Sequence, residues 1–158
     1  MTKKLLIFYI IMCICALSIA ILSQNQFSIE TLSQDYKNGV FQFFCMADID
    51  ENDMNAISVG YGSIVTCDAV EVYKVKSKLK NIQGESYSFN KDDFDVDLFL
   101  QKYGIKTVKK QDLGEIEIVY GYLDKLSKFV VENEKINLEI AVNGNHITVG
   151  YPLIMGSY

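Results

Sequence analysis

The sequence predicts an α+β fold: a mainly antiparallel sheet with two helices packed on one face, preceded by an N-terminal apolar helix. Three observations support this prediction. The chain begins with an uninterrupted apolar run, its middle carries helix-capping and helix-period signals, and its C-terminal third alternates apolar and polar residues. Such alternation is typical of antiparallel strands with one wet face, and helices segregated to one side of such a sheet make an α+β domain.

Residues 1–22 are predicted to be a signal peptide or a membrane anchor. Lys3 and Lys4 precede eighteen uncharged residues at positions 5–22, and a run of about 18 apolar residues can just cross a bilayer. The segment "SIA", ending at Ala20, offers a small-residue cleavage site, so the cleaved and uncleaved alternatives both stay open. Because the two lysines precede the run and all the acids follow it, we expect the body to face outward from the cell membrane or to be secreted.

The charge of the chain argues against nucleic acid as a partner. All fifteen basic residues are lysines, and after residue 22 thirteen lysines stand against twenty acids, a net charge of −7. A polyanion would be repelled by such a body. The absence of arginine also removes the bidentate guanidinium that commonly holds phosphate and carboxylate groups.

The predicted domain covers residues 45–158, after a tether over 23–44 with some helical tendency. Its first element is a strand over about 57–66, rich in β-branched residues. Lysines at alternate positions favour a strand over the next segment, but Asp68 and Glu71 form a capping-box pattern and Gly84 stands where a helix would stop. We therefore expect a helix over 69–82.

The segment "GESYSF" then predicts a strand, and a second helix is expected over about 93–103. Val96, Phe99, Leu100 and Tyr103 fall on one face of that helix, and Gly104 ends it. Four or five strands follow.

The last two strands are predicted to form a hairpin at Asn143-Gly144, a strong type I′ turn signal. With that turn Ile140 faces Ile147, and the turn Gly144-Asn145 would shift the pairing by two residues without changing the faces. The sequence thus predicts which side chains share a face and leaves the register open.

Only Cys45 and Cys67 follow the apolar run and would be exported. In an oxidising compartment they could form one disulfide, worth roughly 3 kcal/mol in the chain-entropy model. The alternative is two free, buried thiols. With His146 they make only three possible ligands, which is too few for structural zinc, so no metal site is assigned.

No catalytic or cofactor-binding residue is assigned from the sequence. Asp48, Asp50 and Asn52 have the spacing of the first calcium ligands of an EF-hand, but Asp53 and Val59 occupy the positions of its glycine and its bidentate glutamate. His146 is the one histidine, and the sequence contains no G-x-S-x-G nucleophile elbow whose serine it could activate as a base. The strand glutamates, Glu115, Glu117 and Glu139, are explained by alternation with apolar residues as a wet face.

The ending "KINLEIAVNGNHITVGYPLIMGSY" resembles the characteristic ending of the secreted bacterial YwmB-type family. The resemblance covers about the last ninety residues, and it lies in a Lys-Ile-Asn-Leu strand, an apolar return strand and a Pro-Leu-Ile segment that closes on an aromatic residue. It implies a leader, an α+β body resembling the TATA-box-binding-protein fold, and a final hairpin. It brings no catalytic residues, and the fold name implies no DNA binding.

Together these features predict a non-enzymatic, membrane-anchored or secreted domain of a Gram-positive-type envelope. Its partners would be the membrane, through the N-terminal segment, and a protein or another envelope component. A secreted hydrolase that uses carboxylates is one alternative, and converging carboxylates in a pocket would favour it. A pilin-like assembly subunit is the other, although residues 5–22 lack the early glutamate typical of pilin leaders.

Overall fold

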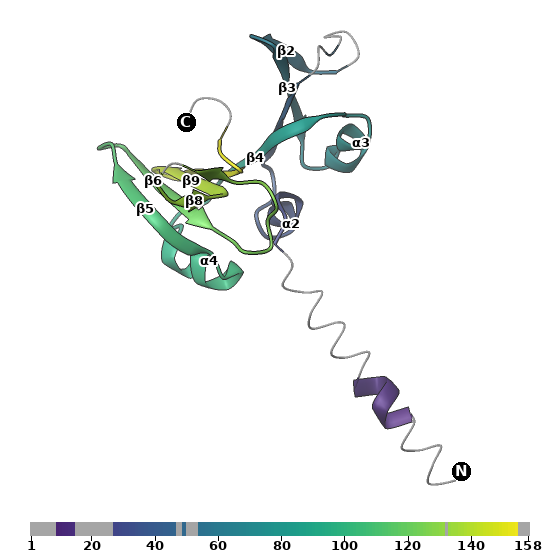
Figure 1. The fold of residues 1–158 in the computed structure, drawn as a ribbon, viewed down its shortest axis with the longest axis vertical. Helices are drawn as coiled ribbons and strands as arrows, with labels where there is room; N and C mark the ends of the chain where they lie inside the picture. Colours follow the sequence, from purple (N-terminus) through teal and green to yellow (C-terminus); the bar gives the residue numbers. More distant parts are fainter. Residues whose placement is uncertain (1–8, 15–26, 47–48, 50–53, 132, 155–158) are drawn as a thin grey trace.

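The fold is α+β with a large antiparallel sheet, as the sequence predicts (Figure 1). The computed structural model describes residues 9–14, 27–46, 49, 54–131 and 133–154. The predicted leader lies outside these residues except for positions 9–14, which are helical. Among the described residues, no helix combines the length and the apolarity needed to cross a bilayer.

The elements of the body follow one another along the chain with short connections. In order they are α2 (Ile29–Asp35), β1 (Val40–Cys45), β2 (Ala56–Val59), β3 (Gly62–Asp68), α3 (Val72–Lys76), β4 (Ile82–Asn90), α4 (Val96–Tyr103), β5 (Lys106–Asp112), β6 (Ile116–Tyr122), β7 (Val130–Val131), β8 (Lys135–Ile136), β9 (Leu138–Asn143) and β10 (His146–Tyr151). The large sheet has the order β2-β3-β1-β4-β10-β9-β6-β5, and β7 pairs with β8 separately. The edges of the large sheet are therefore β2 and β5.

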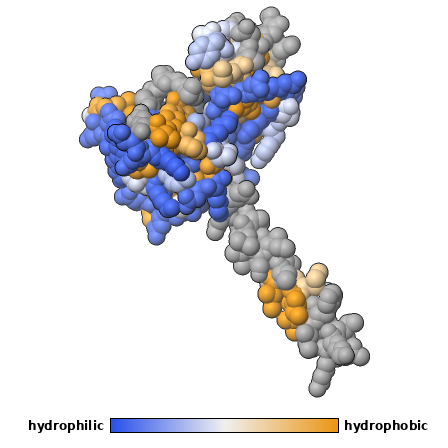
Figure 2. Space-filling model, in the orientation of Figure 1, coloured by the Kyte–Doolittle hydropathy of each residue, from blue (hydrophilic) through white to orange (hydrophobic). Residues whose placement is uncertain are grey.

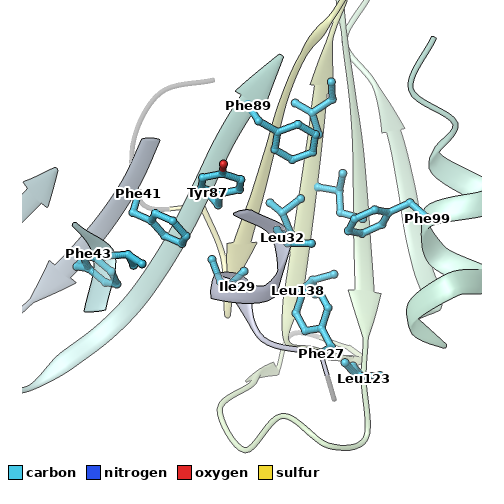
Figure 3. Packing of buried hydrophobic residues seen from close by; sticks show 14 of the residues in the cluster. Phe27, Ile29, Leu32, Phe41, Phe43, Tyr87, Phe89, Phe99, Leu123 and Leu138 are labelled. Atoms are coloured by element: carbon cyan, nitrogen blue, oxygen red, sulfur yellow. The ribbon is translucent and has the colours of Figure 1, made fainter. Parts of the chain in front are cut away.

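One side of the large sheet, which we call the helix face, carries the hydrophobic core. Phe41 pairs with Tyr87, Tyr87 with Val149, and Val149 with Ile140, so these buried side chains lie on the same side. The helices cover this face with the buried residues Ile29 and Leu32 of α2, Val72 of α3, and Phe99 and Leu100 of α4. Figure 3 shows Leu32 and Ile29 packed over the strands, with Phe99 reaching in from α4.

From Phe27 on, the segment expected to be a tether belongs to the domain. Phe27, Ile29 and Leu32 are buried, and β1 lies inside the sheet between β3 and β4. The connection from α2 to β1 is fixed by Tyr87, whose hydroxyl donates to the carbonyl of Tyr36 at 2.5 Å and accepts from the Gly39 N–H at 3.0 Å. The alternation of β1, with Phe41 buried and the neighbouring Gln42 less so, is the signal that indicates a strand here.

The helix expected over 69–82 is much shorter than predicted. Residue Asp68 ends β3, paired with Val40, and the N-cap residue Glu71 makes no side-chain capping bond. Helix α3 covers only Val72–Lys76, and Ile82 begins β4. The capping-box prediction was wrong because pairing with β1 and the long strand β4 take both ends of the segment into the sheet.

The expected strand over 57–66 is a hairpin, because the chain turns at Gly60, whose φ is +59°. The second helix ends where predicted but begins at Val96, about three residues later than expected. The side chain of Asp95 accepts from the Leu98 N–H at 2.9 Å, and Gly104 closes the helix with φ +67°. Polar side chains at the N-cap and glycine at the end are the usual boundaries of a helix.

The final hairpin turns at Gly144-Asn145, the second of the two registers that the sequence allows. His146 pairs with Asn143, and Val149 pairs with Ile140. Ile140, Ile147 and Val149 share the helix face and are fully buried. The predicted sidedness is therefore confirmed, while the pairing of Ile140 with Ile147 is not observed.

Candidate functional site

His146 lies at the exposed start of β10. Its Nδ1 is 3.0 Å from the Oδ1 of Asn90, the residue opposite it on β4. Neither a serine hydroxyl nor a thiol makes a hydrogen bond to it within the described part of the chain. This arrangement is that of a surface cross-strand pair, and it places no nucleophile beside the ring.

Cys45 and Cys67 are both buried free thiols on the helix face. In the β1–β3 register Cys67 stands opposite Phe41 and Cys45 stands opposite Ser63, so the two cysteines are four residue pairs apart. Four strand residues span about 13 Å, and a disulfide requires Cα atoms within about 7 Å. Of the two alternatives for Cys45 and Cys67, the disulfide does not fit this register, and the structure has both as free thiols.

The strand glutamates do not form one wet face. Glu115 and Glu117 are exposed, whereas Glu139 is only 3% exposed. Its carboxylate accepts from the Ile154 N–H at 2.9 Å, and Ile154 packs against Gly150 on the side of the sheet away from the helices. The chain after β10 thus folds back over this side, which explains why a polar residue at an outward position is buried.

A charged cluster joins three elements of the fold. Lys76 of α3 pairs with Glu30 of α2 and, at 2.5 Å, with Glu85 of β4. Lys76 also lies 5.8 Å from the centre of the Phe43 ring. A pocket of about 140 Å³ adjoins the cluster and is lined in addition by Ile82, Gly84, Lys128 and Tyr151.

The two carboxylates of this cluster differ in pKa. Burial raises the pKa of Glu85 above its ordinary 4.5, against the opposing effect of Lys76. Burial acts on Glu30 in the same direction, but hydrogen bonds and the charge of Lys76 outweigh it and lower the pKa of Glu30. Paired carboxylates with separated pKa values are typical of glycosidases. Here a lysine ammonium binds both acids, and this arrangement favours an ionic crosslink of α2, α3 and β4.

The two edges of the large sheet differ in charge. Strand β5 carries Lys106, Lys109 and Lys110 and ends in Asp112. Charged residues, lysine above all, are how natural sheets prevent edge-to-edge association. Strand β2 reads Ala-Ile-Ser-Val, and the whole stretch 56–67 contains no charged residue. The edge at β2 therefore lacks the protection that β5 has.

An apolar row crosses the sheet at the β2 edge. On the side away from the helices, Ile57 pairs with Ile64, and Ile64 pairs with Phe44 of β1. Ile57 is 62% exposed, and Tyr61 in the turn of the hairpin is 79% exposed. Figure 2 shows pale and orange atoms over β2 and β3, in contrast to the deep blue over β5. We call residues 56–64, with Phe44, the β2 edge patch.

Neither feature was assigned as a site from the sequence. Glu30, Lys76 and Glu85 come from three segments whose proximity depends on the tertiary fold, so no local pattern indicates them. The β2 edge patch lies in an uncharged stretch, residues 54–67, but the chain has longer uncharged stretches at 5–22 and, with His146 neutral, at 140–158, so this signal does not distinguish the patch. What the sequence does not show is that this stretch lies at the end of the sheet.

The comparisons with known proteins add no assignment. No family model, no curated protein and no solved structure matches this chain. Within the described residues, no group of three or more His, Cys, Asp or Glu side chains could hold a metal ion. The Asp48, Asp50 and Asn52 segment lies outside those residues.

Proposed function

We propose that this chain is a non-enzymatic binding domain of a bacterial envelope, anchored in the cell membrane or secreted, that contacts a protein through the β2 edge patch. The observation that carries the proposal is the uncharged, solvent-exposed edge strand β2 beside the row Ile57, Ile64 and Phe44. The N-terminal apolar run supports an extracytoplasmic location, since it follows lysines and precedes every acid.

An exposed strand edge can bind another chain through its backbone. Its outward N–H and C=O groups are a template for another chain, and native proteins generally protect such edges. Exposed apolar side chains next to the edge add a favourable burial of about 25 cal/mol per Å² when a partner covers them. The combination of an uncharged edge and an exposed apolar row is therefore suited to protein contact.

The resemblance to the YwmB-type family is part of this proposal. Membership would give an exported α+β body without catalytic residues, which agrees with a binding role. A nucleic-acid partner is not proposed, because the region after residue 22 carries a net charge of −7.

A photo-crosslinking amino acid at position 57, introduced into the full chain in intact cells, tests the contact. We expect covalent protein adducts from position 57 and few from position 109, which lies on the charged edge strand β5. Ile57→Lys, in an exposed position, should leave folding intact and should reduce adducts formed from a probe at the neighbouring Tyr61. Equal adduct yields from positions 57 and 109 would contradict the proposal.

The location is tested separately with protease added to intact protoplasts. We expect the body to be degraded without lysis. Protection of the body until the membrane is broken would contradict the extracytoplasmic location, whatever the crosslinking result.

A further inference from the structure

We infer that the partner at the β2 edge patch is a second copy of this chain, joined strand to strand so that the two large sheets become continuous. The inference rests on the proposed function, because it names the partner of the same patch. Two copies would pair their β2 strands antiparallel about a twofold axis that passes beside Ser58. Interfaces of this closed, self-complementary kind are the commonest in soluble oligomers.

The backbone of β2 presents its bonding groups at the correct place for such pairing. The Thr66 N–H donates to the Asn55 carbonyl at 2.8 Å, so the Asn55 carbonyl points toward β3. Because these directions alternate along an antiparallel strand, Ile57 and Val59 also bond toward β3, and Ser58 directs its N–H and C=O outward. Two Ser58 residues facing each other would exchange both hydrogen bonds.

The side chains are also self-complementary in this register. When Ser58 faces Ser58, Ile57 of each copy stands opposite Val59 of the other, and residues directly opposite point to the same face. The side of the sheet away from the helices would then carry Ile57 and Val59 from both copies, flanked by both Ile64 residues. Four apolar side chains at the junction would become less exposed together.

Charge favours this edge over the other one. Residues 56–67 contain no charge, so a copy facing a copy brings no like charges together at β2. Two β5 strands in the same arrangement would bring Lys106, Lys109 and Lys110 of both copies together, which is unfavourable. The uncharged β2 edge suits an uncharged partner surface. A second copy of this chain provides such a surface, with its Val59 opposite Ile57.

The size and net charge of the molecule indicate a weak dimer. A four-residue strand and one apolar row cover less than the roughly 1,200 Å² of a standard stable interface. The regions after residue 22 also repel each other, at −7 each, so added salt should strengthen the dimer by screening. Confinement of both copies to one membrane would raise their effective concentration and favour pairing.

Cysteine crosslinking of the full chain in its native membrane tests the inference. The experimental variant is Ser58→Cys and the matched control is Thr107→Cys on β5, both exposed hydroxyl-bearing residues of edge strands. Cys13 and Cys15 are replaced by alanine in both, because the leader could crosslink by itself. Under mild oxidation we expect a disulfide-linked dimer from Ser58→Cys in roughly tenfold excess over Thr107→Cys.

Ile57→Lys added to Ser58→Cys provides the specificity control. It should reduce the dimer to the level of Thr107→Cys, and its thermal unfolding should match that of Ser58→Cys alone. Equal dimer yields from Ser58→Cys and Thr107→Cys, or a yield that Ile57→Lys does not change, would overturn the second-copy inference.

The two proposals fail in distinguishable ways. If a photo-probe at position 57 captures a different protein and Ser58→Cys yields no specific dimer, the second-copy inference falls and the binding function stands. If neither experiment yields specific adducts, both fall.

Discussion

At the scale of single residues, His146 should contribute little to folding. It is exposed and its one described side-chain bond is to Asn90 at 3.0 Å, on the neighbouring strand. We expect His146→Ala to lower the free energy of unfolding by less than about 1 kcal/mol, as surface substitutions usually do. Urea unfolding of the purified chain measures this. A variant that folds normally but loses every cellular function would show that the histidine has a role that its surroundings do not indicate.

The two thiols of the body should be alkylated without prior reduction. Burial, with the nearby charges of Glu71 and Asp68, raises the pKa of Cys67 to about 11, and burial also raises the pKa of Cys45. Because the thiolate is the reactive form, both thiols should react slowly in the native protein at neutral pH and rapidly in denaturant. Peptide mass spectrometry locates the label. A Cys45–Cys67 peptide that appears only under non-reducing conditions would contradict the register of β1 and β3.

At the scale of elements, Lys76 is expected to be the link that holds α2 and α3 to β4. Lys76→Met would leave Glu30 and Glu85 close together without their shared cation. Removing one partner of a buried ion pair commonly costs 3–5 kcal/mol, and the 31% exposure of the Lys76 side chain reduces this to about 2 kcal/mol.

Lys74→Met on the same helix is the matched control. Its side chain is 71% exposed and its ion pair with Glu71 is 3.7 Å long, so its loss should change the free energy of unfolding by less than about 0.5 kcal/mol. Chemical denaturation of both variants measures the difference. Equal effects would mean that the cluster does not join the elements.

The cluster of Lys76, Glu30 and Glu85 should make the free energy of unfolding depend on pH in two opposite ways. The pKa of Glu30 is lowered in the fold, so its contribution is present above 4.5 and is lost as the pH falls through the lowered pKa. The pKa of Glu85 is raised, so the fold binds that proton more readily and gains stability as the pH falls from the raised pKa toward 4.5.

Denaturant midpoints recorded from about pH 3 to pH 7 separate the two acids. Glu85→Gln should remove the gain in stability that occurs as the pH falls toward 4.5. Glu30→Gln should remove part of the loss of stability that occurs as the pH falls below 4.5. If Glu85→Gln leaves the profile above pH 4.5 unchanged, the raised pKa of Glu85 is contradicted.

Local signals predicted elements well where nothing in the tertiary structure competed with them. Helix α4 has the expected face and the expected end at Gly104, because its periodicity and its glycine agree, although it begins about three residues later than expected. Helix α3 differs, because the capping pattern at Asp68 and Glu71 competed with strand pairing to β1, and pairing prevailed. In the final hairpin, the alternation of apolar and polar residues determines which side chains face the core. Both turn registers keep that alternation, so it does not determine which residues pair.

At the scale of the whole molecule, the strand order depends on pairing between distant parts of the chain. Strand β1 pairs with β3 and β4, and β10 pairs with β4 and β9, so the middle of the sheet combines distant parts of the chain. No local pattern predicts such pairing. The burial of Glu139 and the cluster around Lys76 depend on it, and so does the position of β2 at an edge, where the β2 edge patch becomes accessible.

Because β10 lies inside the sheet, the end of the chain should be indispensable for folding. Deleting the chain from Ile147 onward would remove Ile147 and Val149, both fully buried, and would expose the edges of β4 and β9. Burial of such side chains contributes about 1.5 to 3 kcal/mol each, so their loss together with the pairing is comparable to the whole stability of a small domain. We expect no cooperative thermal unfolding of the deletion variant.

A milder pair of substitutions keeps this prediction testable if the deletion variant is insoluble. Ile147→Ala in the middle of the sheet should cost about 2 to 5 kcal/mol, whereas Ile57→Ala at the exposed edge should cost less than about 1 kcal/mol. Both remove the same atoms from isoleucines in strands, so the difference in the free energy of unfolding reports burial alone. A cost for Ile147→Ala no larger than that for Ile57→Ala would show that β10 is not a central strand and would contradict the strand order from which the exposed β2 edge follows.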